Sequence, residues 1–226
     1  MSVFVISLGG SLVSPEAGKV DVAFLRKFRA LIVRYVKRGH QFAIIVGGGK
    51  LARVWQESAK RLAIKRISEL DWVGIRATQL NAELVRAMFE NAAQGAVVFN
   101  PKQGVGKFKI LIGAGYVPGH STDYDAVVRA KTVGTRTVIN LSNVKYVYDK
   151  DPSKFKDAKP LKKISWPEYH ERFHARWVPG VNVPFDSKAA HLAWRSGIRV
   201  VFMDGRNLKN FERFLQGKKF DGTIIG

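Results

Sequence analysis

The sequence contains no cysteine, which excludes disulfide frameworks and thiolate metal sites and makes a reducing cytoplasm the expected compartment. Long apolar runs are also missing: "FAIIV" at 42–46 is typical, and it is far shorter than the roughly 20 residues of a membrane span. The chain does not open with a basic segment followed by a long apolar stretch. We therefore expect neither a signal peptide nor a membrane partner.

Acidic residues are scarce: 18 Asp and Glu stand against 38 Lys and Arg, which gives a net charge of +20. Such a balance favours anionic partners, namely nucleotides, nucleic acids or acidic surfaces. The basic residues are spread along the chain without a basic tail, so a solvated basic surface explains the charge equally well. The charge alone therefore indicates only that the protein can bind anions, without identifying which ones.

Short runs rich in Val and Ile, bounded by Gly, Pro, Asn or Asp, predict buried strands of a largely parallel sheet. These runs are 3–8, 42–46, 96–99, 110–113, 137–141 and 200–203. Helical patterns lie between or after them at 21–39, 50–63, 74–93, 123–133, 166–175, 187–196 and 208–216. Asp21 and Asn207 are the expected N-caps of two of these helices, and Gly39 the expected stop of one.

The alternation of strands and helices predicts an α/β fold, a three-layer αβα sandwich around a mainly parallel open sheet. We expect one domain over residues 1–226. The lysine-rich stretch 143–165 is too long for a simple connection, so it is expected to be a functional or lid-like subregion.

Glycine-rich turns follow three of the predicted strands. They are "LGGSL", "VGGGKLAR" and "IGAGYVPGHSTDYD". Glycine lets backbone N–H groups face a ligand, and a following helix N-terminus favours anions. Three such turns at one edge of a sheet favour an extended polyphosphate or two phosphorylated ligands over purely steric turns. None of them is a Walker A loop, and no Gly-x-Gly-x-x-Gly opens the first helix.

Two cations, Lys50 and Arg53, fall in the first turn of a predicted helix, where they oppose the helix dipole unless an anion binds there. Arg53 could hold a phosphate in bidentate fashion, and the alternative is an ordinary surface arginine. The segment "PGHSTDYDAVV" adds hydroxyls and carboxylates at another helix start: Ser121, Thr122, Asp123 and Asp125. They are either a capping cluster or substrate-binding hydroxyls with a carboxylate that orders lysines or Mg²⁺.

The segment "HERFH" at 170–174 fits the His-Glu-x-x-His zinc pattern. A capping box from Ser165 to Glu168 predicts a helix here, which would place His170 and His174 on one face. Five-residue matches arise by chance and no third ligand can be named, so we do not favour a metalloprotease. A kinase acting on a phosphate, by contrast, needs positioned charges more than an acid–base pair.

The order of motifs resembles the amino acid kinase family, and within it the archaeal-type uridylate (UMP) kinases. The motifs are "GGSL", "GGGKLAR", "DWVGIRATQLNA", "PGHSTDYDA", "NVKYVYDKDP", "VPFDSKAAHLAWRSGI" and "GTII", and together they span nearly the whole chain. The resemblance implies an ATP- and Mg²⁺-dependent kinase that converts UMP to UDP in pyrimidine nucleotide synthesis. It also implies a cytoplasmic homo-oligomer, commonly a hexamer built on dimers.

The resemblance assigns residues by position. It implies catalytic roles for Asp123, Lys50 and Arg53, and no metal-ligating side chain, because Mg²⁺ would arrive with ATP. ATP would contact Gly9, Gly10, Ser11, Gly49, Arg53, Ser142, Asn143, Tyr148 and Asp151. UMP would contact Gly48, Asp71, Gly74, Pro118, Gly119, His120, Ser121 and Thr122. The acceptor-binding part would cover about 1–135 and the ATP-binding part about 136–226.

Two alternatives stay open. One is a kinase of the same fold with another phosphate acceptor, such as isopentenyl phosphate. The other is a non-catalytic nucleotide- or RNA-binding protein, suggested by the net charge and by the aromatic–basic stretch "KKISWPEYHERFHARW" at 162–177. Nucleic acid is nevertheless not expected as the main partner.

The chain departs from the family pattern at three positions. Lys145 and Tyr146 replace the acid and the glycine of the usual Asn-Val-Asp-Gly-Val-Tyr, and Ser7 stands where many relatives carry a phosphate-binding lysine. Lys145 either adds charge near the donor nucleotide or faces solvent. We expect Lys50, Arg53 or a residue of 143–151 to supply the charge that Ser7 cannot.

Overall fold

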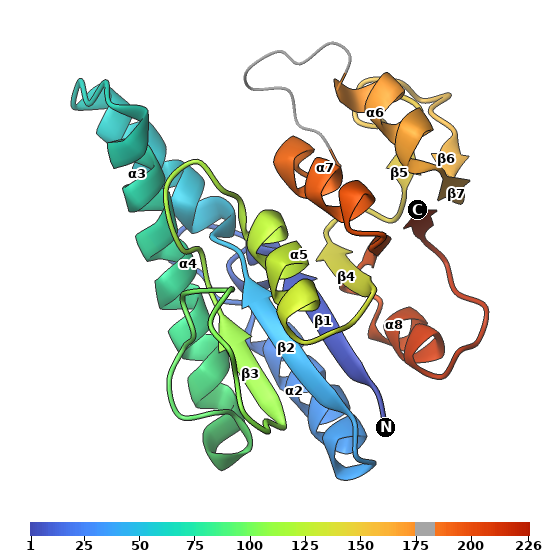
Figure 1. Ribbon diagram of the computed structural model, residues 1–226. Coiled ribbons are helices and arrows are strands. Elements are labelled where there is room, and N and C mark those ends of the chain that lie inside the picture. The colour runs from blue at the N-terminus through green and yellow to red at the C-terminus, as the bar shows by residue number, and fades with distance from the viewer. Residues whose placement is uncertain (175–183) are drawn as a thin grey trace.

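The computed structural model describes residues 1–174 and 184–226, and a seven-stranded sheet forms the centre of this part of the chain (Figure 1). In spatial order the strands are β3 (Ile110–Gly113), β2 (Gln41–Val46), β1 (Val3–Leu8), β4 (Thr137–Ser142), β8 (Arg199–Asp204), β9 (Thr223–Ile225) and β7 (Lys163–Ile164). Neighbouring strands are parallel except for β9, which runs antiparallel to β8. The mainly parallel open sheet is therefore confirmed.

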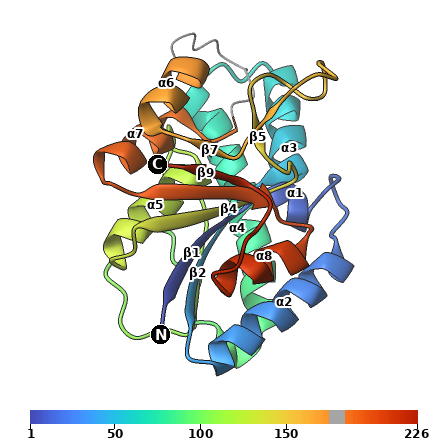
Figure 2. The ribbon, with the colours of Figure 1, turned by 90° about the vertical axis from the view of Figure 1, so that its right-hand side faces the viewer.

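Helices cover both faces of the sheet, as Figures 1 and 2 show from two sides. They are α1 (Gly10–Val13), α2 (Val22–Lys37), α3 (Gly49–Arg61), α4 (Ile67–Phe89), α5 (Thr122–Thr132), α6 (Trp166–His174), α7 (Ser187–Arg195) and α8 (Leu208–Leu215). One hydrophobic core joins α2, α4 and α8 to the sheet, and a second joins α5, α6 and α7 to the opposite face. This is the expected three-layer αβα sandwich. No helix in the described ranges is long and apolar enough to cross a membrane.

Burial on both faces explains why the strands read as continuous apolar runs. Ile6 and Leu8 of β1 pack into the core on one face, whereas Val5 packs into the core on the other. Ile44 and Ile45 of β2 divide in the same way. Successive side chains of a strand point to opposite faces, so a strand covered on both sides needs apolar residues at every position.

The expected capping residues begin and end their helices. The Asp21 carboxylate accepts a hydrogen bond from the Phe24 backbone N–H at 2.9 Å, and the Asn207 side chain accepts one from Asn210 N–H at 3.0 Å. Gly39 follows α2 with φ +87°, a conformation that favours glycine. Of the two hydrogen bonds of the capping box expected at α6, the structure shows the one that Glu168 N–H donates to Ser165 Oγ, at 3.4 Å.

Two expected elements were wrong. Residues 96–99 do not form a strand: only Val98 pairs, through one isolated bridge to Gly113 at the edge of the sheet. The run ends at Asn100-Pro101, and proline has no N–H with which to extend a ladder. Helix α4 begins at Ile67 rather than at residue 74, so Asp71 lies inside a helix that continues through Gly74.

The stretch 143–165 contains short strands that were not expected. β5 (Val147–Tyr148) and β6 (Pro160–Leu161) form an antiparallel two-stranded sheet, and β7 then joins the main sheet beside β9. Pairs of residues are too short to show a period of two, so hydrophobic alternation gives no signal for them.

Candidate active site

The carboxyl ends of the parallel strands meet at one edge of the sheet. β2 and β3 lie on one side of β1, whereas β4 and β8 lie on the other. The ends of β1 and β4 therefore form a topological switch point, which is where open α/β sheets bind ligands. Three loops leave this edge: the first loop (residues 9–11) after β1, the second loop (47–49) after β2 and the third loop (114–121) after β3.

The first and second loops touch backbone to backbone. A Cβ on Gly10 would lie 2.1 Å from the Gly49 nitrogen, and a Cβ on Gly47 would lie 2.8 Å from the Gly10 nitrogen. Gly49 also has φ +61°. The glycines at these positions thus have a steric cause that needs no ligand. Their close approach also brings two sets of loop N–H groups to one place, where neighbouring phosphates could share them.

Asp123 lies above the switch point, at the start of α5. Its Oδ1 accepts hydrogen bonds from Ser7 Oγ at 2.7 Å and from Asn140 Nδ2 at 2.8 Å. Ser7 of β1 and Asn140 of β4 are direct partners in the parallel ladder. The carboxylate is thus held by the two parallel strands at which the strand order of the sheet reverses.

The surroundings of Asp123 oppose its negative charge. Loss of water around the carboxyl raises its pKa to about 6, and the nearby Asp186 carboxylate acts in the same direction. The hydrogen bonds from Ser7 and Asn140 favour the charged form and oppose this shift. A carboxylate that burial makes costly to ionise, at the switch point of an open sheet, is typical of a functional site.

Arg53 connects the first two loops. It lies in α3 directly after the second loop, and its Nη2 donates a hydrogen bond to Ser11 Oγ of the first loop at 3.0 Å. Lys50 also lies at the start of α3 and is exposed. The structure thus brings the guanidinium of Arg53 to the meeting point of the first and second loops.

The third loop is held from two sides. Gly119 N–H donates to Asp71 Oδ2 of α4 at 2.8 Å, and Gly119 C=O accepts from Lys188 Nζ of α7 at 2.7 Å. Gly119 has φ +81°, which explains the glycine. Pro118 and His120 flank it in the chain, and the His120 ring stacks on Tyr124 at 4.2 Å between centroids.

The end of the third loop also starts a helix. Ser121 is the N-cap of α5 and its Oγ accepts from Tyr124 N–H at 3.2 Å, with Thr122 as the first helical residue. The capping interpretation of this segment is therefore correct for Ser121. Asp123 shows that it is incomplete, because that side chain turns to the switch point rather than to the helix end.

Gly48 and Gly74 face each other where α3 and α4 begin to pack. A Cβ on Gly48 would lie 2.5 Å from Ala52 Cβ and 3.5 Å from the Gly74 carbonyl oxygen. Asn81 of α4 donates from Nδ2 to the carbonyl oxygens of Gly47 and Gly48, at 2.9 and 3.2 Å. Helix α4 therefore fixes the second loop as well as the third.

The residues expected around the ATP nucleoside are brought together only in part. Ser142 and Asn143 leave the end of β4 at the switch-point edge, and Tyr148 lies in β5. The Asp151 carboxylate accepts hydrogen bonds from Ser153 N–H and Oγ, at 2.9 and 2.7 Å, and these bonds lower its pKa. The contacts described for Asp151 thus belong to its own exposed turn.

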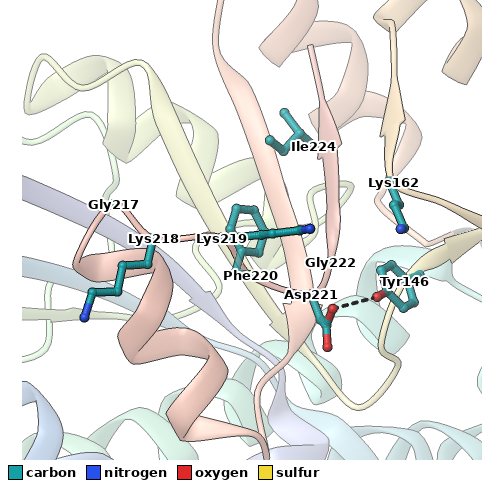
Figure 3. Close-up of a pocket in the computed structure, with 9 residues that line it drawn as sticks. All are labelled: Tyr146, Lys162, Gly217, Lys218, Lys219, Phe220, Asp221, Gly222 and Ile224. Carbon is teal, nitrogen blue, oxygen red and sulfur yellow. Dashed lines mark hydrogen bonds between the residues drawn. The ribbon is translucent and has the colours of Figure 1, made fainter.

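Lys145 and Tyr146, the two departures from the family pattern, share one partner. Lys145 Nζ lies 3.3 Å from Asp221 Oδ2, and Tyr146 Oη donates to Asp221 Oδ1 at 3.1 Å. Figure 3 shows the Tyr146 and Asp221 side chains facing each other. Both residues line an open depression of ≈ 330 Å³. Asp221 holds the pKa of Lys145 above its ordinary value. Lys145 is therefore engaged with the C-terminal segment rather than simply facing solvent.

The zinc hypothesis gains no support from the described residues. Within 1–174 and 184–226 no three His, Asp or Glu side chains lie close enough together to hold a metal ion. The His170 ring packs among other rings, and its centroid lies 5.1 Å from that of Trp194 and 5.9 Å from that of His191. The side chain of His174 and part of the stretch 162–177 lie outside the described residues.

Sequence reasoning missed several residues of the site. Asn140 carried a signal, because an amide in the middle of a buried apolar strand requires a partner. Lys188 gave none: its contact with Gly119 spans 69 positions of the chain. Asp125 was weighed only as part of a cluster. It is buried, its pKa is raised to about 7 by burial, and it accepts a hydrogen bond from Tyr116 N–H of the third loop at 3.2 Å.

Comparison with known proteins places this geometry in a family. The model of the amino acid kinase family matches residues 2–204. The uridylate kinases of Staphylothermus marinus and Thermoplasma volcanium are each 32% identical over 224 residues, which cover 98% of this chain and 97% and 96% of those proteins. The crystal structure of uridylate kinase from Archaeoglobus fulgidus superposes with a TM-score of 0.82 at 30% identity, covering 100% of this chain and 99% of that one. The chain belongs to the amino acid kinase family.

Proposed function

We propose that this protein is a UMP kinase that transfers the γ-phosphoryl group of ATP to UMP, giving UDP for pyrimidine nucleotide synthesis. The observation that carries the proposal is the contact between the first and second loops beside Asp123. Two glycine-rich loops that meet at one switch point suit two phosphates that must come into contact. The similar proteins named uridylate kinases match nearly the whole chain, which supports UMP as the acceptor. The enzyme works in the cytoplasm.

The two substrates enter from opposite sides of the switch point. Residues 1–135 carry the second and third loops and bind UMP, with Asp71 and Lys188 fixing the loop around it. Residues 136–226 bind the ATP nucleoside, while the first loop holds the ATP phosphates through backbone N–H groups. Arg53 spans the two phosphates, since its guanidinium already contacts the first loop.

Transfer needs little acid–base chemistry, because the attacking oxygen of UMP belongs to a phosphate that is already ionised at neutral pH. Rate acceleration then comes from alignment of the two phosphates and from fixed donors that stabilise the transferring group. Asp123 orients the groups at the point of transfer, and Ser7 and Asn140 orient Asp123.

Mg²⁺ fits this site as an ion that arrives with ATP. Mg²⁺ is commonly bound by one or two carboxylates together with substrate phosphates rather than by an all-protein cage. Asp123 and Asp186 lie near each other and could contribute, whereas the described residues contain no cluster of three ligands. When bound, the ion supplies neutralisation of phosphate charge.

The acceptor is tested by measuring initial rates with ATP and Mg²⁺ across a panel of UMP, CMP, isopentenyl phosphate and carbamate. UMP is expected to give the highest kcat/KM, with UDP as the product. A folded protein that phosphorylates isopentenyl phosphate but not UMP would establish the same-fold alternative. A folded protein that phosphorylates none of them would support the non-catalytic one.

The cation that replaces the lysine absent at Ser7 is expected to be Arg53. Arg53→Ala should lower kcat/KM by about 10- to 100-fold, because a charged hydrogen bond to a phosphate is lost. Arg61→Ala changes an exposed arginine at the end of α3, the helix that carries Arg53, and is the matched control. A normal rate in Arg53→Ala with a large loss in Lys50→Ala or Lys145→Ala would assign the role to that lysine instead.

Lys188→Ala should mainly raise the KM for UMP, because the substitution removes the hydrogen bond that holds one side of the third loop.

The protein is a homo-oligomer, expected to be a hexamer built on dimers, and α3 and α4 supply the dimer contact. Large apolar side chains are exposed on and between these helices: Val54, Trp55, Leu62, Ile67, Trp72, Leu80 and Leu84. Exposed apolar patches of this kind commonly mark protein interfaces. Trp55→Glu is expected to shift the mass measured by light scattering to a smaller species, whereas Phe155→Glu, in the 143–165 stretch, should leave it unchanged. An unchanged mass in Trp55→Glu would place the interface elsewhere.

A further inference from the structure

A basic groove runs between α5 and α7, on the face of the sheet opposite α2 and α8. Its volume is ≈ 760 Å³, and it is lined by His120, Tyr124, Lys131, Ser187, Lys188, His191, Leu192, Arg195 and Ser196. The lining contains three permanent cations and two histidines but no carboxylate. We call this feature the α5–α7 groove, and we propose that it binds single-stranded nucleic acid through its phosphate backbone.

The spacing of the cations suits an extended polyanion. Lys188 and Arg195 lie seven positions apart on α7, and Tyr124 and Lys131 lie seven positions apart on α5. At about 1.5 Å of rise per residue, each helix spreads its polar groups over roughly 10 Å. The groove thus distributes its cations over two helices, with Lys188 and Arg195 on α7 and Lys131 on α5.

The positive charges in and near the groove affect His120, one of the residues that line it. Burial lowers the pKa of His120, and the charges of Lys188 and Lys102 lower it further, while the Asp186 carboxylate acts in the opposite direction. Among the described residues, no ion pair engages Lys131, Lys188 or Arg195. Lys188 donates to the Gly119 carbonyl oxygen, and its charge, like those of Lys131 and Arg195, is not neutralised by a carboxylate among the described residues.

Aromatic rings accompany the cations. His120 stacks on Tyr124 at one end of the groove. Surfaces that bind single strands combine a positive groove with rings on which bases stack. A small-molecule pocket is enclosed, whereas this groove is open, and five of its nine lining residues are Lys, Arg or His.

The test measures fluorescence anisotropy of a labelled oligoadenylate RNA of about 12 nucleotides, a length within the range of known single-strand sites. The variant Lys131→Gln/Arg195→Gln removes two cations of the groove and leaves the proposed UMP site intact. The matched control is Arg26→Gln/Lys27→Gln on α2, an exposed pair on the opposite face with the same change in charge. UDP formation by both variants monitors folding.

We expect the groove variant to bind RNA about tenfold more weakly at low salt, and its slope of log K against log salt to fall in magnitude by about 1.4, or ~0.7 for each lost phosphate contact. The control should bind as the unmodified protein does. An equal loss in both variants would show diffuse surface charge and overturn the proposal. Full displacement by mononucleotides, without dependence on RNA length, would show a small-molecule site and overturn it as well, as would the absence of any binding at low salt.

Discussion

Asp123→Asn is expected to lower kcat by about 100- to 1000-fold, the loss typical when one preorganised polar group is removed from a transition state. The asparagine oxygen can still accept from Ser7 and Asn140, so the fold and the position of the side chain should persist. What disappears is the charge at the switch point. Rates of UDP formation at saturating ATP and UMP measure the effect.

The same substitution is expected to stabilise the protein at neutral pH. The folded-state pKa of Asp123, about 6, lies above the ordinary value of 3.8. The folded protein therefore binds this proton more tightly than the unfolded chain does, and stability is lost as pH rises through this window. Asparagine cannot ionise, so the Tm of the variant should exceed that of the unmodified protein above pH 6 and match it below pH 4.

Asp125→Asn is the matched control for this pair of effects. Its carboxyl has a pKa raised to about 7, and an amide oxygen could still accept from Tyr116 N–H. It should raise the Tm at high pH without the large loss of kcat. Normal turnover in Asp123→Asn, or a lower Tm at pH 8, would contradict the role assigned to Asp123.

Gly10→Ala is expected to destabilise the protein by about 3 kcal/mol or more, at the upper end of overpacking effects. The added methyl would meet the Gly49 nitrogen at 2.1 Å and the Gly47 carbonyl oxygen at 2.4 Å. Both neighbours are backbone atoms, so no side chain can rotate away. The two loops must separate, and kcat should fall with stability. Urea unfolding followed by circular dichroism gives the free energy of unfolding.

Gly106→Ala supplies the comparison for Gly10→Ala. A Cβ there would meet no atom within 4 Å, and the backbone is not in the left-handed region. The change should be nearly neutral, or slightly stabilising because alanine restricts the unfolded chain. Similar free energies of unfolding for the two variants would mean that the first and second loops do not touch.

The sheet and most helices could be predicted because their signals are local. The runs at 3–8 and 110–113 appear unchanged as β1 and β3, and Asp21 begins α2 as its residue type indicates. The failures also have local causes. The run at 96–99 has the composition of a strand but pairs at one residue only, and the strands of two residues in 143–165 carry no period.

The candidate site could be predicted only as separate pieces. The glycine loops were visible, and the resemblance ordered them, but the contact of Ser7 with Asp123 joins residues 116 positions apart. The partner shared by Lys145 and Tyr146 is Asp221, on the C-terminal segment. Such contacts depend on the packing of the whole sheet, and one sequence contains no signal for them.

A crystal structure of the protein with UMP and a non-hydrolysable ATP analogue tests the proposed arrangement of the two substrates most directly. We expect the analogue's phosphates on the backbone N–H groups of the first loop and the UMP phosphate at the second. The Arg53 guanidinium should lie between the two phosphates, and Asp123 should lie at their point of contact. Phosphates bound away from the switch point, or Arg53 in contact with neither nucleotide, would contradict this arrangement.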